Sequence, residues 1–451
     1  MGHLRQQLPG SGELERFRDS MFLAMDQWGD ALFELADAML SSPRRVDSVP
    51  SLSLEPVFRR SHGSLYKALA RGNVDVESLR DAVVEHRPKE WPNVFVVDAT
   101  TWPRRHAETS PERGLYYSAS QHSSGTPVVA GWSYQWMCQV GFEHDSWTAP
   151  LDVERFAPLS DATAQTVTQV NALLARIGDD NEVPLFVFDA GYDPIALGQG
   201  LNDARCEVLV RLRSNRVFYP DPEPKAPRAT GRPRRHGARF CLAEPQTFPK
   251  PDATFTDTDP RYGTISVSAF HGMHPRLAQR GRWTDVVAPI VRGSILRIEA
   301  EHLPKHSAAV KKTLWLWWSG TGTPDLERCA RSYLRRFDIE HTFRFIKQTL
   351  GWATPSLQTP AQADRWTWLV LSAYTELRLA RDLVVDLRLP WERTVERRSL
   401  TPGRVRRGFR QLHAIIGTPT SPPKATSPGP GRPKGTQRPR RTRHPVVMKA
   451  A

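Results

Sequence analysis

The chain contains only four cysteines in 451 residues, and no two of them are close in sequence. They are Cys138, Cys206, Cys241 and Cys329, so a Cys-x-x-Cys pair is missing. This spacing argues against a zinc ribbon and against a disulfide framework, and it fits a reducing compartment. No run approaches the ~20 apolar residues of a membrane span, and no apolar signal core follows the N-terminus. We therefore expect a soluble, unexported protein of the cytoplasm.

Acidic residues are also missing from the last part of the chain, residues 401–451. This part contains twelve basic residues: Arg404, Arg406, Arg407, Arg410, Lys424, Arg432, Lys434, Arg438, Arg440, Arg441, Arg443 and Lys449. The formal net charge is +14 and the pI is about 9.9, so nearly all of the excess positive charge lies in the tail. A polyanionic partner is the leading explanation, and a solvated, disordered end is the alternative.

The composition is otherwise that of a globular protein, with 39% hydrophobic and 24% charged residues. We predict a helical N-terminal region (1–90), the first part of an α/β core (91–213), a β-rich insertion (214–312), the second part of the core (313–385), a basic C-terminal segment (386–416) and a disordered basic tail (417–451). Two roles are open for the N-terminal region, namely binding of DNA ends and packing against the core.

The alternation of short apolar runs with helical spacing defines the fold class. Apolar or β-rich runs predict strands at 94–98, 114–121, 127–140, 185–189 and 206–212, and shorter strands at 263–270, 286–291 and 294–300 in the insertion. Apolar residues at helical spacing predict helices at 12–41, 64–70, 76–86, 163–177, 194–204, 324–350 and 361–383. Strands come first and then alternate with helices, so we predict an α/β fold whose early strands pair antiparallel.

Three carboxylates stand out against this background. Asp98 ends the apolar run Val-Phe-Val-Val, Asp189 ends Leu-Phe-Val-Phe, and Glu340 lies in the helical segment 333–347. A carboxylate beside a buried strand is costly to desolvate unless a positive group meets it. Hard divalent cations take oxygen ligands, so the three residues suggest one metal site. Each also has an ordinary alternative, which is a helix cap or turn for the aspartates and an ion pair for Glu340.

The segment 333–347 strengthens the assignment of Glu340. If it forms one helix, Tyr333, Arg336, Glu340 and Lys347 fall on one face, because they are separated by three, four and seven residues. A carboxylate with nearby cations suits a site that handles metal and phosphate together. Asp338 would point about 160° away from Glu340 on that helix, and Asp193 precedes a proline as a helix cap does.

These residues carry a resemblance to a known family. The chain resembles DDE transposases of the bacterial insertion-sequence type, in the group marked by Tyr-x2-Arg-x3-Glu-x6-Lys. Tyr333, Arg336, Glu340 and Lys347 match that signature at every position. The sequences around the two aspartates, Val-Val-Asp-Ala-Thr and Phe-Asp-Ala-Gly-Tyr-Asp, are also similar to that family. The resemblance covers residues 90–385.

The resemblance implies an RNase H-like mixed sheet flanked by helices, with the β-rich insertion between the second aspartate and the glutamate. It further implies that Asp98, Asp189 and Glu340 bind two Mg²⁺ ions, which Mn²⁺ can replace, and catalyse DNA cleavage and strand transfer. Tyr333, Arg336 and Lys347 would contact phosphates near the DNA end. The implied partners are the terminal inverted repeats of the element, target DNA and a second copy of the chain in a synaptic dimer, all at the bacterial nucleoid.

Two alternatives share the acidic trio. One is an RNase H-like nuclease without strand transfer, and the other is a transposase-derived protein that binds DNA without cutting it. Two Gly-Arg-Pro segments, at 231–235 and 431–434, suggest DNA contact by extended basic arms. Relatives can stack a flipped base on a tryptophan, for which the candidates are Trp283, Trp315, Trp317 and Trp318.

Overall fold

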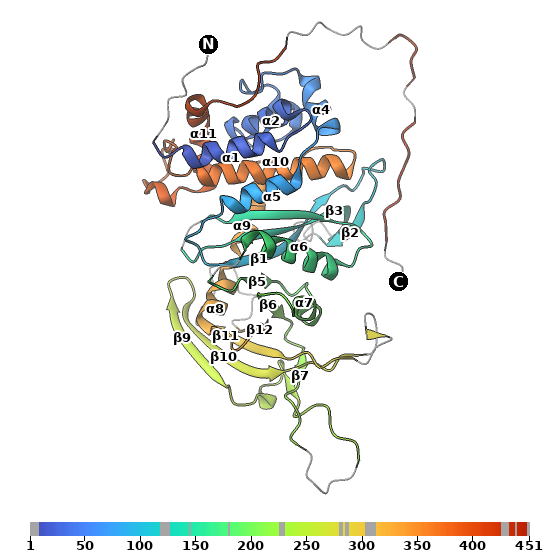
Figure 1. Cartoon of the computed structure of the whole chain (residues 1–451), viewed down its shortest axis with the longest axis vertical. Helices are drawn as coiled ribbons and strands as arrows, with labels where there is room; N and C mark the ends of the chain where they lie inside the picture. The colour runs from blue at the N-terminus through green and yellow to red at the C-terminus, as the bar shows by residue number, and fades with distance from the viewer. Residues whose placement is uncertain are drawn as a thin grey trace. The chain divides into compact units, whose positions relative to one another are not determined.

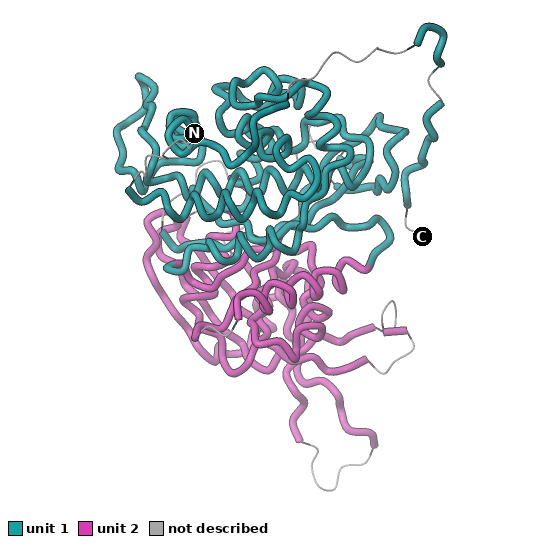
Figure 2. The backbone as a smooth tube through the Cα atoms, turned by 45° about the horizontal axis from the view of Figure 1, so that its top comes forward, with its two compact units in different colours: residues 1–90, 98–160, 338–451 teal, residues 91–97, 161–337 magenta. Residues whose placement is uncertain are grey.

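The computed structural model describes residues 9–117, 127–143, 146–178, 181–224, 231–278, 283–284, 288–302, 313–424, 433–437 and 440–448 (Figure 1). The chain forms two compact units (Figure 2). Unit 1 comprises residues 1–90, 98–160 and 338–451, and unit 2 comprises residues 91–97 and 161–337. Because strand β1 (Val94–Pro103) crosses from one unit to the other, each unit contains part of it.

Unit 1 begins with helices at the predicted places and with one short helix at Val49–Leu52 that was not predicted. These are α1 (Gly12–Leu23), α2 (Gly29–Ser41), α3 (Val49–Leu52), α4 (His62–Arg71) and α5 (Val76–Glu85). The predicted helix 12–41 is therefore interrupted, since Trp28 adopts a left-handed conformation with φ of 60° and precedes α2. The later helices of unit 1 are α9 (Asp338–Gln348), α10 (Pro360–Leu379) and α11 (Pro402–Ile416).

Helix α10 is the centre of unit 1. It begins with a capping box in which Thr359 accepts from the Gln362 backbone and the Gln362 side chain accepts in return, and Pro360 occupies the first turn. From Trp366 to Leu377 every residue is buried, because the helix contacts α1, α2, α4, α5 and α11 as well as strand β4. A helix that is buried all round is expected to lie in a core rather than on a surface.

The strands of unit 1 pair antiparallel, as predicted. They are β2 (Gly114–Tyr117), β3 (Val128–Gln139) and β4 (Ala149–Phe156), with β3 in the middle of the three. Strand β1 also lies beside β3. Nine consecutive residues of β3, from Gly131 to Gln139, are buried. A strand with both faces covered loses the apolar and polar alternation of a half-exposed strand.

Unit 2 is built on a mixed sheet. Its strand order is β1, β5 (Leu185–Phe188), β6 (Glu207–Leu212), β12 (Thr313–Ser319), β11 (Gly293–Ala300), β10 (Gly263–Met273) and β9 (Ala253–Asp259). The first three strands are parallel and the others pair antiparallel. The helices of this unit are α6 (Ala162–Ile177), α7 (Pro194–Gly200) and α8 (Leu326–Arg335). The predicted α/β class, a mixed sheet with flanking helices, is confirmed.

The segment predicted as an insertion, residues 214–312, is rich in strands and extends this sheet. Strands β9, β10 and β11 join it through β12, while β7 (Val217–Phe218) and β8 (Phe240–Cys241) form a separate two-stranded ribbon. The predicted strand 286–291 does not appear in its described part, residues 288–291. Residues 286 and 287 lie outside the described residues. None of the helices among the described residues is long and apolar enough to cross a membrane.

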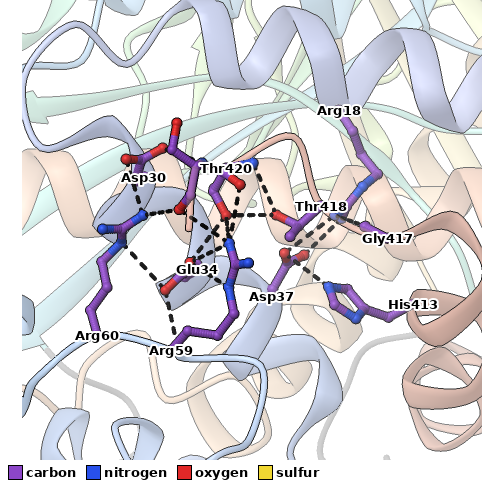
Figure 3. A network of polar contacts seen from close by, with 11 residues as sticks. Arg18, Asp30, Glu34, Asp37, Arg59, Arg60, His413, Gly417, Thr418 and Thr420 are labelled. Carbon is purple, nitrogen blue, oxygen red and sulfur yellow. Dashed lines mark hydrogen bonds and ion pairs between the residues drawn. The ribbon is translucent and has the colours of Figure 1, made fainter. Parts of the chain in front are cut away.

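A buried polar network joins the N-terminal and C-terminal helices of unit 1 (Figure 3). The guanidinium of Arg18 on α1 binds the carboxylate of Asp37 on α2 at 2.8 Å and also that of Glu376 on α10. His413 on α11 approaches Asp37 with an Nε2–Oδ2 distance of 3.0 Å. The side chains of Arg18, Asp37 and Glu376 are 3%, 1% and 0% exposed. The network therefore links α1, α2, α10 and α11 through side chains that solvent hardly reaches.

The start of the predicted disordered tail takes part in this network. Thr420 accepts a hydrogen bond from Arg59 and donates one to Glu34 at 3.0 Å, and the Ser421 backbone N–H donates to Asp30 at 3.0 Å. Further on, the Val447 backbone N–H donates to the carbonyl of Arg113 at 2.7 Å. Sequence periodicity misses these contacts, because the segments form neither helix nor strand.

Candidate metal-dependent active site

Two of the predicted acidic residues follow a paired position in neighbouring strands. In unit 2, β1 and β5 are parallel, and the last residues paired in register are Val97 and Phe188. Asp98 is the next residue after Val97, and Asp189 is the next after Phe188. Both aspartates are half-buried, whereas the four residues before each of them are buried. Each apolar run therefore leads into a carboxylate that solvent still reaches. Asp189 follows the end of β5, as predicted, whereas the predicted strand end at Asp98 is wrong, because β1 continues to Pro103.

Asp189 is held by the tight turn that follows β5. Its Oδ1 atom accepts a hydrogen bond from the Gly191 backbone N–H at 2.8 Å. Asp193 makes different contacts. Its Oδ1 atom accepts hydrogen bonds from the backbone N–H groups of Ile195 at 3.0 Å and Ala196 at 3.2 Å. Asp193 is thus the N-cap of α7, which confirms its prediction as a helix cap.

Gly191 is adapted to this arrangement. A Cβ atom at this position would lie 3.0 Å from Oδ1 of Asp189, which is closer than an ordinary contact. The resemblance places Asp189 at a reacting centre, where small displacements are costly. We therefore expect Gly191→Ala to turn this carboxylate and to reduce the DNA cleavage that the resemblance implies by about tenfold. The melting temperature should change little, because only a side chain at a surface turn must move. Steady-state cleavage and thermal melting check the two expectations, and an unchanged cleavage rate would show that this carboxylate position is unimportant.

The predicted single helix through 333–347 is wrong. Helix α8 ends at Arg335 and α9 begins at Asp338, with a turn at residues 336–337 between them. No glycine or proline marks the break in the sequence. The available signal is Asp338 itself, since an acidic residue is favourable in the first turn of a helix. The argument that one helix face carries all four signature residues therefore does not hold.

Helix α9 keeps half of the predicted arrangement. Glu340 and Lys347 lie on it seven residues apart, which places them on the same face two turns from each other. Glu340 is exposed and Lys347 is half-buried. The Lys347 ammonium donates a hydrogen bond to Oγ1 of Thr100 on β1 and lies 5.6 Å from the ring centroid of Trp352.

The electrostatic setting of Lys347 includes the first aspartate. Burial lowers the pKa of the Lys347 ammonium to about 8, and the carboxylate of Asp98 acts in the opposite direction. Lys347 and Asp98 thus influence each other within unit 1. A lysine beside a metal-binding carboxylate can neutralise it or bind a phosphate oxygen.

Tyr333 and Arg336, the other two signature residues, are buried in unit 2. Tyr333 is 0% exposed and Arg336 is 4% exposed. The Arg336 guanidinium lies 5.8 Å from the ring centroid of Tyr333 and 4.8 Å from that of Phe337. Burial raises the pKa of the Tyr333 hydroxyl, against the effect of the nearby Arg336 and Arg211. A direct contact of either residue with DNA would require its side chain to become exposed.

The chemistry of the acidic trio fits a hard divalent cation. Asp98, Asp189 and Glu340 provide only carboxylate oxygens, the ligands that Mg²⁺ and Mn²⁺ take, and none of them is sealed from solvent. Asp98 and Glu340 belong to unit 1 and Asp189 belongs to unit 2. Over the described ranges, no three His, Cys, Asp or Glu side chains are grouped closely enough to hold a metal ion.

Sequence reasoning missed the residues that position this site. Thr100, which holds the Lys347 ammonium, lies two residues after Asp98 and could have been found from that spacing. Gly191 has no signal beyond being a glycine next to a predicted strand end. Of the tryptophans considered for base stacking, Trp315, Trp317 and Trp318 are 5%, 0% and 2% exposed and form part of the core of unit 2.

A half-buried aspartate within β1 and another directly after the parallel strand β5, with a helical glutamate, provide the carboxylate ligands used by enzymes that cleave nucleic acids with divalent metal ions. A family model described as "DDE superfamily endonuclease" matches residues 19–276, which is more than half of the chain. The chain therefore belongs to this family of endonucleases. The match confirms the predicted DDE class of enzyme. Enzymes of this class generally use divalent metal ions. It spans Asp98 and Asp189 and ends before Tyr333, Arg336, Glu340 and Lys347, so the signature of the insertion-sequence group stays a prediction.

Among solved structures, the chain is similar to one titled "Cryo-EM structure of piggyBac transposase synaptic complex with hairpin DNA". The sequence identity is 10%, the TM-score is 0.45, and the alignment covers 91% of this chain and 82% of that chain. A likeness at this level assigns no residue roles. None of the curated proteins matches this chain significantly.

Proposed function

We propose that this DDE superfamily endonuclease is a transposase that cleaves DNA at the ends of its own mobile element and joins those ends to a target. The observation that carries the proposal is the pair of aspartates that follow the register pair Val97 and Phe188 of two parallel strands. The family match includes both of these aspartates.

We propose that Asp98, Asp189 and Glu340 together hold two divalent metal ions, Mg²⁺ in the cell and Mn²⁺ as a substitute. Such ions activate a water molecule or a 3′-hydroxyl and stabilise the leaving oxygen of a phosphodiester when they are bound. The three carboxylates supply the negative charge that this requires.

The neighbouring residues of the chain position these carboxylates. The Gly191 N–H fixes one oxygen of Asp189, and Lys347, held by Thr100, provides a cation beside Asp98. We assign phosphate binding to Lys347, which is half-buried. Tyr333 and Arg336 are buried against each other, so we assign them to holding the end of α8, with DNA contact only after they become exposed.

The partners follow from the reaction. We propose that the chain binds the terminal inverted repeats of its element and target DNA, that two copies act together in a synaptic complex, and that it acts where bacterial DNA lies, at the nucleoid in the cytoplasm. The piggyBac structure is titled a synaptic complex with hairpin DNA, and it supports DNA as the partner only by analogy. The net charge of +14 also fits a polyanionic partner.

A strand-transfer assay tests this function. Purified protein is incubated with Mg²⁺, a labelled duplex that carries the ends of the element, and a supercoiled target plasmid. We expect cleavage at the ends followed by their covalent joining to the plasmid. Cleavage that never leads to joined product would support the nuclease without strand transfer, and tight binding without cleavage would support the non-catalytic protein. Either of these results would overturn the proposed function.

A further inference from the structure

A basic cavity lies in unit 2, and none of the residues assigned to catalysis is among the described residues that line it. Its volume is about 650 Å³. Its walls include Arg235, His236 and Arg276, together with the apolar residues Pro275, Leu277, Ala278, Ala288, Pro289 and Ile290. Arg235 is the last residue of the Gly-Arg-Pro segment at 231–235, whose residues are exposed, and His236 follows it. No carboxylate is present among the described residues that line it.

One of the two arginines of this cavity, Arg235, is held in place by the fold. One guanidinium nitrogen of Arg235 donates to the carbonyl of Ala288 at 3.0 Å. Ala288 also lines the cavity but belongs to a later segment of the chain. The ring of His236 lies against that of Tyr219, with 5.2 Å between centroids, and its Nδ1 is 3.0 Å from Nε2 of the buried His274. A cation whose position is fixed loses less conformational entropy when it binds an anion.

The positive charge at the cavity belongs to the arginines. Burial lowers the pKa of His236, and the charges of Arg235 and Arg276 lower it further. His236 is therefore largely neutral at physiological pH. Asp221 follows β7 along the chain. Its carboxylate already accepts hydrogen bonds from Arg292 at 2.9 Å and 3.0 Å. The cavity thus faces solvent with two guanidinium groups and no compensating carboxylate on its described wall.

We propose that this cavity binds the phosphate backbone of duplex DNA through Arg235 and Arg276, with the exposed segment from 231 to 234 lying along the same strand. Guanidinium groups bind phosphate oxygens in a bidentate way, and a duplex carries one negative charge per ~1.7 Å of its axis. The inference rests on the proposed function, because it names where the DNA substrate is held outside the three carboxylates.

The salt dependence of DNA binding tests the inference. The affinity for a fluorescent duplex of random sequence is measured without metal at several salt concentrations, so that cleavage plays no part. The slope of log K against log salt should become less steep by about 1.8 in Arg235→Gln/Arg276→Gln, because each lost phosphate contact removes ~0.9. Arg276→Gln alone should remove ~0.9. Arg276 is exposed, and its replacement alone leaves the hydrogen bond from Arg235 to Ala288 intact.

The matched control removes the same number of charges elsewhere in unit 2. Arg239 and Arg331 are already paired with Glu244 and Asp257, and Arg239→Gln/Arg331→Gln should leave the slope unchanged. Equal slopes for the cavity variant and this control would overturn the inference, while end cleavage by the wild type would still support the proposed function. If the cavity variant loses slope and the wild type never cleaves, the inference stands and the proposed function fails.

Discussion

Asp189→Asn should abolish metal-dependent cleavage of the element ends, with a loss of about 10³-fold or more. Asparagine keeps the size of the side chain and its acceptor for the Gly191 N–H, but it removes the negative charge that binds a divalent cation. A loss of this size corresponds to about 4 kcal/mol in the activation free energy, which is within what metal ions contribute to phosphoryl transfer. Asp98→Asn and Glu340→Gln should behave alike. Single-turnover cleavage of a labelled duplex measures the effect.

The control for this prediction is Asp193→Asn, four residues further along the chain. Asp193 caps α7, and asparagine caps a helix about as well as aspartate does. This variant should therefore keep nearly wild-type cleavage and melting temperature. If Asp193→Asn and Asp189→Asn lost activity equally, the loss would reflect the local fold or charge, and the assignment of Asp189 as a metal ligand would fail.

Arg18→Ala should strongly destabilise unit 1. Figure 3 shows the contact between Arg18 and Asp37. The substitution leaves two carboxylates, Asp37 and Glu376, buried without their shared cation. Loss of one partner of a buried ion pair costs about 3–5 kcal/mol. Burial already raises the pKa of Glu376 to about 7, although Arg18 acts in the opposite direction, so its carboxylate depends on that cation for its charge. Denaturant unfolding followed by tryptophan fluorescence should show a much earlier transition.

Two variants separate this network from a general effect of losing an arginine. Arg16→Ala changes an exposed arginine on the same helix, and it should shift the unfolding midpoint very little. In Arg18→Leu/Asp37→Asn/Glu376→Gln the two buried charges are removed with the cation, which should recover part of the stability. Equal destabilisation by Arg16→Ala and Arg18→Ala would mean that the buried network does not stabilise the fold.

Much of the fold could be predicted, because the pattern of apolar residues reports burial directly. The runs before Asp98 and Asp189 are buried on both faces, and each is a strand in the structure. The predicted helix 163–177 appears as α6 over Ala162–Ile177, with Asp161 as its N-cap. These elements are local, and their periodicity or capping residue lies within the element itself.

The missed features depend on residues far apart in sequence. The break between α8 and α9 has no local breaker, so helical propensity alone predicts one continuous helix. The network of Arg18 joins residues more than 300 positions apart, and its partners look like ordinary surface charges in the sequence. Tyr333 was predicted to meet DNA because of its place in the signature, whereas its burial follows from packing that the signature does not encode.

The central claim, that the three acidic residues are metal ligands, is tested most directly by a change in metal preference. Cysteine is placed at position 98, 189 or 340 by Asp98→Cys, Asp189→Cys or Glu340→Cys, and end cleavage is measured in Mg²⁺ and in Mn²⁺. Mn²⁺ accepts a sulfur ligand more readily than the harder Mg²⁺ does. The expected result is cleavage lost in Mg²⁺ and partly restored in Mn²⁺ for each variant. Cleavage in Mg²⁺ at the wild-type rate by these variants would contradict the claim.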